Sequence, residues 1–270
     1  MKKSLFLVVL FVLTISINGF GQKGFYAGFS GNAGISAIGN QNLYGLKWSY
    51  LNNDKTFDPA YKLTLGYGAN AKIGYNFSPP LGMQFELGYQ KRGQNYEDTD
   101  GKDVTHTKDI SLNYITTGVY FRYTSIFRKN FYKREQKVRL AITVGPQINV
   151  LVSADQTYSL SGEIIDAFGL DLTDIDYPSN NPPQWTSDYN FTSTDNDKEL
   201  FRNVDIGLLA RVGVDFYPKK WFFISPTLTS YLSLTDINNK DYTQHSGYGQ
   251  SRNFSVGFEL GIGFYVNKKS

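Results

Sequence analysis

The sequence predicts an all-β protein: an eight-stranded antiparallel up-and-down β-barrel that spans a membrane. Two observations predict it, namely long segments in which apolar and polar residues alternate and joins between them that alternate in length. The last such segment, residues 253–266, has Phe, Leu, Ile or Val at every second position from Phe254 to Val266 and mostly small or charged residues between. Because side chains in a strand point to opposite faces with period two, one face of this segment is wholly apolar. A tilted strand of about 9–11 residues crosses a bilayer, so this segment can cross it and protrude.

Seven earlier segments repeat the alternation, the seventh of them less regularly. They are residues 25–37, 61–77, 81–96, 110–127, 138–153, 203–217 and 222–234. Pro146 and Pro226 lie inside two of them, where each removes a ladder donor and indicates a bulge or an interrupted edge. No segment shows the 3.6-residue period of a helix. We therefore expect one domain built from strands alone.

The joins between the segments are the second observation. Short joins lie at 78–80, 128–136 and 218–220, and long joins lie at 38–60, 97–109, 154–202 and 236–252. Membrane barrels of the up-and-down type have short periplasmic turns and longer extracellular loops. With the N-terminus in the periplasm, every short join falls inside and every long one outside. A soluble barrel gives no reason for this segregation, so the pattern predicts the membrane class.

The first 21 residues predict export. Lys2 and Lys3 precede an apolar run at 5–17, and Gly19-Phe20-Gly21 precedes a cleavage point before Gln22, which is the order of regions in a secretory signal peptide. The alternative is an uncleaved membrane anchor, but the run is short for a spanning helix. We expect a multi-pass protein of the bacterial outer membrane after signal removal, with residues 22–270 forming the barrel domain. The chain has no cysteine, which excludes acylation on cysteine, disulfides and thiol chemistry.

The composition agrees with a membrane barrel. The chain has 26 Gly, 20 Tyr and 20 Phe, and yet its mean hydropathy is −0.34. Only alternate residues of a membrane barrel meet lipid, and aromatic girdles lie at both interfaces. A net charge of +3 argues against nucleic acid, for which a clustered basic face is expected. The expected partners are outer-membrane lipid, the barrel-insertion machinery and an envelope or secretion-system protein.

The charged residues also divide between the short and the long joins. The short joins and the tail are basic, through Arg128, Lys129, Lys133, Arg134, Lys219, Lys220, Lys268 and Lys269. The longest join is acidic and includes Asp171, Asp174 and Asp176. One interpretation is that both are the solvated ends of the barrel; the other is that the acidic join meets divalent cations or a cationic partner.

The polar faces of the strands carry charges that we expect inside the barrel. They are Lys62, Lys72, Glu86, Arg122, Arg139, Asp205, Arg211, Asp215 and Glu259. Eight strands enclose an interior about wide enough for side chains to fill, and buried charges of opposite sign should pair. The favoured interpretation is an ion-paired core that stiffens the barrel and leaves the protein a structural or interaction role. The alternative is an ion-selective constriction, hence a narrow porin-like channel or transporter for small solutes. A secreted ligand-binding barrel of lipocalin type is a third class, and it would be soluble without detergent.

No pattern of catalytic or metal-binding residues stands out. The two histidines, His106 and His245, have neither cysteines nor the spacing of a zinc site. Asp171, Asp174 and Asp176 lack the glycine and terminal glutamate of an EF-hand loop. His245-Ser246 has no G-x-S-x-G elbow beside it. The sequence therefore predicts no catalytic residue, no metal, no cofactor and no enzymatic activity.

Several short motifs carry a resemblance. They are Leu112-Asn113-Tyr114-Ile115 with Tyr120-Phe121-Arg122-Tyr123, Gly145-Pro146-Gln147, Asp205-Ile206-Gly207-Leu208 and Arg252-Asn253-Phe254. In these motifs the chain resembles the PorT-like family of outer-membrane β-barrel proteins. The resemblance implies an outer-membrane location and makes Pro146 a family feature, but it implies no single activity. The chain end departs from the usual pattern, because Val266 is followed by Asn267-Lys268-Lys269-Ser270 where a terminal aromatic residue is common.

Overall fold

The fold is taken from a computed structural model that describes residues 24–39, 60–78, 80–99, 105–124, 138–161, 191–196, 198, 201–219, 221–239 and 250–266. The predicted signal peptide at 1–21, the predicted basic join at 128–136, most of the predicted acidic join and His245 lie outside the described residues. So do Lys220, Lys268 and Lys269. His106 lies in a strand, but its side chain is not among those described.

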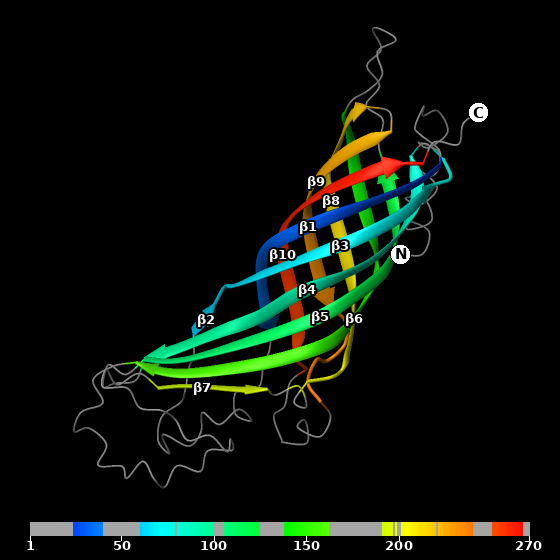
Figure 1. Cartoon of the computed structure of the whole chain (residues 1–270). Coiled ribbons are helices and arrows are strands. Elements are labelled where there is room, and N and C mark those ends of the chain that lie inside the picture. Colours follow the sequence, from blue (N-terminus) through cyan, green and yellow to red (C-terminus); the bar gives the residue numbers. More distant parts are fainter. Residues whose placement is uncertain are drawn as a thin grey trace, which may run out of the picture.

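The described part of the chain contains ten strands, and eight of them close a barrel. They are β1 (Gly24–Gly39), β2 (Ala60–Lys62), β3 (Thr64–Asn76), β4 (Leu81–Thr99), β5 (Thr105–Thr124), β6 (Val138–Ser161), β7 (Phe191–Asn196), β8 (Val204–Lys219), β9 (Phe222–Ser233) and β10 (Arg252–Tyr265). The eight without β2 and β7 pair antiparallel in chain order, and β1 pairs with β10 to close the ring (Figure 1). The predicted eight-stranded antiparallel barrel is confirmed. The described residues contain no helix that is long and apolar enough to cross a membrane.

The alternation of the sequence separates the two faces of the barrel wall. On β10, Phe258, Leu260 and Ile262 point outward and are exposed, whereas Glu259 points inward and is buried. Large exposed apolar residues lie on each of the eight barrel strands. Near the chain termini the outer face carries aromatic pairs, including Phe25 with Tyr75 and Trp221 stacked on Phe264, at centroid distances of 4.6 and 6.0 Å. An apolar band that ends in aromatic residues is the surface that a bilayer requires.

This outer face leads to a first prediction. Leu260 lies about halfway along β10 and is 51% exposed. Leu260→Arg should destabilise the barrel in bilayers by about 2–4 kcal/mol, because folding would place the charged side chain in the hydrocarbon of the bilayer. Urea titration of the variant folded into vesicles would measure the loss, with Leu260→Val as the matched control. An unchanged midpoint for Leu260→Arg would mean that this face does not contact lipid.

Two glycines face each other at the seam where the barrel closes. Gly34 of β1 lies opposite Gly257 of β10, and a Cβ atom added to Gly34 would lie 2.3 Å from the Cα atom of Gly257. Any side chain at this position would push the two strands apart. The two facing glycines therefore allow β1 and β10 to pair along their length, from Tyr26–Tyr265 to Gly39–Arg252.

At the end away from the termini, which we call the distal end, β4, β5 and β6 continue past their neighbours. This distal extension comprises residues 91–99 of β4, 105–113 of β5 and 153–161 of β6, together with β2, which pairs with residues 95–97 of β4, and β7, which pairs with β6 (Figure 1). The prediction of a long join at 97–109 is therefore wrong, since β4 and β5 pair up to Thr99 and Thr105. The residues that the prediction missed are polar on the outer face, as with Glu97 opposite Thr107, so they lack the apolar alternation of the membrane-facing strands. Likewise, β7 lies within the predicted join at 154–202.

Candidate functional site

The interior of the barrel is the candidate site, and its central layer is an ion-pair network of four residues from four strands. Arg211 of β8 donates from Nη1 and Nη2 to the two carboxylate oxygens of Glu86 on β4, at 2.5 and 2.8 Å. Its Nε lies 3.0 Å from Oε2 of Glu259 on β10. Lys72 of β3 forms an ion pair with Glu259 and lies 3.7 Å from Glu86. The layer contains two cations and two carboxylates, so its buried charges balance.

A second layer lies nearer the termini and centres on Asp215. This carboxylate pairs with Arg122 and accepts hydrogen bonds from Tyr217 at 3.2 Å and Ser225 at 2.7 Å. The Arg122 guanidinium also lies 5.0 Å from the ring centroid of Tyr26. Four buried aromatic residues form a cluster beside this layer: Tyr26, Tyr217, Phe223 and Tyr265. Together they fill the terminal end of the interior.

A third layer lies nearer the distal end and centres on Asp205. Oδ2 of Asp205 accepts hydrogen bonds from Tyr231 at 2.9 Å and from Asn149 and Asn253 at 3.2 Å each. Its other oxygen accepts from Ser233 and Thr235. The nearest cation is Arg92, whose Nη1 lies 3.9 Å away. Neutral donors thus satisfy most of this buried carboxylate.

Beyond the third layer, an apolar cluster covers the distal end of the interior. Its buried members are Ile38, Tyr96, Ile110, Leu112, Tyr114, Leu151, Ala154, Phe201 and Ile237. Phe201 precedes β8 and Ile237 follows β9, and Arg202 donates its backbone N–H to the carbonyl of Ile237 at 2.7 Å. Hence the segments that flank these strands fold over the barrel end and pack against the distal extension.

Seven of the nine charged residues predicted for the interior lie in the three layers, and two do not. Lys62 was predicted wrongly: its side chain is 49% exposed and forms a surface ion pair with Glu97 at 3.2 Å. The cause is one extra residue between Lys62, which pairs with Asn95, and Tyr67, which pairs with Lys91, since this bulge reverses the faces. Arg139 is half-buried, with its guanidinium 4.5 Å from the ring centroid of Tyr217.

Sequence reasoning named neither Arg92 nor any tyrosine among the interior site residues. Arg92 has the same parity as Glu86 and is buried, with its guanidinium 3.7 Å from the ring centroid of Tyr231. Lys91 and Arg92 are adjacent, so charge alone does not show which of the two side chains points inward. Counting every second residue from Glu86 would have identified Arg92. Tyr120, which donates to Gln147 at 3.1 Å, likewise has the parity of Arg122.

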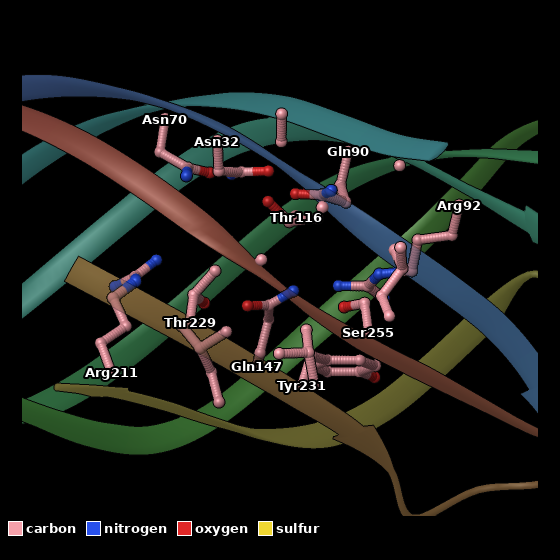
Figure 2. A pocket seen from close by; sticks show the side chains of 17 residues that line it. Asn32, Asn70, Gln90, Arg92, Thr116, Gln147, Arg211, Thr229, Tyr231 and Ser255 are labelled. Carbon is pink, nitrogen blue, oxygen red and sulfur yellow. The ribbon is translucent and has the colours of Figure 1, made fainter. Parts of the chain in front are cut away.

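Among the described residues, two small cavities lie between the layers. One, of about 30 Å³, lies between the central and distal layers, and the side chains that surround it are shown in Figure 2. The other, of about 20 Å³, lies between the central layer and the layer near the termini. Arg211 lines both, so the central ion-pair layer separates them. Among the described residues, no cluster of three or more His, Asp or Glu side chains could hold a metal ion.

A closed wall with an apolar outer face and a filled, ion-paired interior defines a small outer-membrane β-barrel protein. The sequence matches the outer membrane protein β-barrel domain family over residues 20–239, and the chain belongs to this family. A search of curated proteins found no significant match.

Several solved barrels are similar to this chain. Neisserial surface protein A matches 90% of this chain and 97% of its own, with 10% identity and a TM-score of 0.38. OprG from Pseudomonas aeruginosa matches 92% and 98%, with 11% identity and a TM-score of 0.37. The attachment invasion locus protein Ail of Yersinia pestis matches 90% and 100%, with 14% identity and a TM-score of 0.31.

Proposed function

We propose that the protein is a non-enzymatic, non-conducting barrel that anchors an interaction surface in the outer membrane. The observation that carries this proposal is the interior, in which three polar layers and two buried clusters occupy the space between the barrel ends. A water molecule needs a cavity of at least about 10–15 Å³, so cavities of about 30 and 20 Å³ hold a few small molecules at most. The geometry therefore favours the filled core over the narrow channel.

The distal extension supplies the interaction surface in this proposal. Its outer face is polar, and hydrogen bonds link the three strands where the extension begins: Tyr89, just before the extension, donates to Asn113 at 2.6 Å, and Asn113 donates to Ser153 at 2.8 Å. Asp109 lies further out on the same face and is exposed. A polar sheet that projects beyond an apolar band suits contact with a protein in water rather than with lipid. We also propose that the signal peptide is removed and that the long joins lie outside the cell. Within the family, we propose that the chain is one of the PorT-like proteins.

A photo-crosslinking residue at two positions of β5 tests the interaction role in whole cells. Asp109 and Val119 both point outward, but Asp109 lies on the distal extension and Val119 on the apolar band. The probe at Asp109 should give a discrete protein adduct, whereas the probe at Val119 should give none, because it faces hydrocarbon. Both variants must show the heat-modifiable folded band. Equal adduct patterns, or none at Asp109, would contradict the proposed role of the extension.

A further inference from the structure

The larger cavity combines two arginines with a wall that lacks carboxylates. Its polar lining consists of Asn32, Asn70, Gln90, Arg92, Thr116, Gln147, Arg211, Thr229, Tyr231 and Ser255 (Figure 2). None of the described residues that line it is Asp or Glu. The carboxylates that approach the two arginines, Glu86, Glu259 and Asp205, do not belong to the cavity wall. The cavity therefore has cationic and neutral hydrogen-bonding groups and no anionic ones.

Arg92 has more unmet hydrogen-bonding capacity than Arg211. It is 2% exposed, and its Nε and Nη1 atoms have no hydrogen-bond partner among the described residues. Figure 2 shows its guanidinium reaching from β4 into the cavity beside Ser255. Arg211 differs, because both its Nη atoms donate to Glu86 and its remaining donor, Nε, lies 3.0 Å from Oε2 of Glu259.

Asp205 does not supply the missing partner. It lies 3.9 Å from Arg92, beyond hydrogen-bonding distance, and five neutral side chains already donate to its two oxygens. A buried cation with unmet hydrogen-bond donors is costly, and a small anion beside it would offset that cost.

We propose that this cavity binds one small monovalent anion of the halide class, held by Arg92. Ser255 offers a hydroxyl donor around the same space, and Gln90 and Gln147 each offer a second amide hydrogen, since the first is donated to Lys91 and Asn149 respectively. At about 30 Å³ the cavity exceeds the space that one water molecule needs, and it is too confined for a phosphate ester or a sugar acid. The anion accepts hydrogen bonds from the donors of Arg92 that Asp205 does not reach, and it links β4 to the opposite wall of the barrel. This inference is independent of the proposed interaction role.

Thermal unfolding of the purified barrel in detergent tests the site. We expect chloride and bromide to raise the midpoint by about 3 °C or more over gluconate at equal sodium concentration, because an anion that binds the folded state stabilises it. Arg92→Gln should abolish this difference, whereas Arg139→Gln, a change at the rim outside the cavity lining, should retain it.

A second variant protects the test if Arg92→Gln fails to fold. Ser255→Leu keeps the arginine but fills the cavity, and it too should abolish the halide effect. In a crystal soaked in bromide, the anomalous signal of bromine should lie beside the Arg92 guanidinium. Equal midpoints in the three salts for the wild-type barrel, a halide effect that survives Ser255→Leu, or a cavity without bromine signal would overturn the proposal.

Discussion

Replacing Glu86 with glutamine should lower the free energy of unfolding by about 3–5 kcal/mol, because it removes one partner of a buried ion-pair network. Glu86 is 3% exposed and accepts from both Nη atoms of Arg211. In the variant, Arg211 and Lys72 would share the single carboxylate of Glu259, leaving an uncompensated charge inside the wall. The loss can be measured as a shift of the urea midpoint for the barrel in detergent micelles or vesicles.

Two further variants make this prediction specific to the buried layer. Lys62→Gln removes a partly exposed ion pair with Glu97 and should cost about 0–1 kcal/mol. The double variant Glu86→Leu with Arg211→Met leaves Lys72 paired with Glu259, so it should be more stable than Glu86→Gln alone. If Glu86→Gln and Lys62→Gln cost the same, the interior network does not stabilise the barrel as described here.

Gly34→Val should prevent the barrel from closing. A Cβ atom at this position would lie 2.3 Å from both the Cα atom of Gly257 and the backbone oxygen of Val256, so the backbone of β10 would have to move. Backbone cannot shift here without loss of the β1–β10 pairing, and we expect a cost above about 4 kcal/mol, which belongs to the most severe class of substitution. The measurement is the loss of the fast-migrating folded band on an unheated gel.

The matched control is Gly31→Val on the same strand. Gly31 points outward, and a Cβ atom there would meet only the backbone oxygen of Gly68, at the ordinary contact distance of 3.9 Å. This variant should keep the folded band. A folded band from both variants would show that the seam can widen and that the facing glycines are not required for closure.

Period-two parity predicted the strands and faces of the barrel well, because lipid and interior impose opposite demands on alternate residues. It failed where a bulge reversed the faces, as at Lys62, because one extra residue is invisible in an alternating pattern. It also failed on the outer part of the distal extension, beyond the predicted strand ends at 96 and 110, where the outer residues are polar, as with Glu97 opposite Thr107.

Parity could not predict which charges pair inside the barrel. Arg139 and Asp215 are cross-strand neighbours in the register of β6 and β8, so a strand-by-strand reading would pair them. In the structure Asp215 instead pairs with Arg122, which comes from β5, a strand that does not pair with β8. Arg211 likewise reaches across the interior to Glu86. These partners are set by barrel diameter and side-chain length, which a linear pattern does not contain.

Single-channel recording of the wild-type barrel in planar bilayers tests the filled interior most directly. Insertion is first confirmed by heat-modifiability of the same preparation. The three buried layers and the two clusters that fill the barrel ends predict a flat trace, without unitary current steps, at any applied voltage that the bilayer tolerates. Reproducible current steps from the folded, inserted protein would contradict a filled interior and would favour the narrow channel.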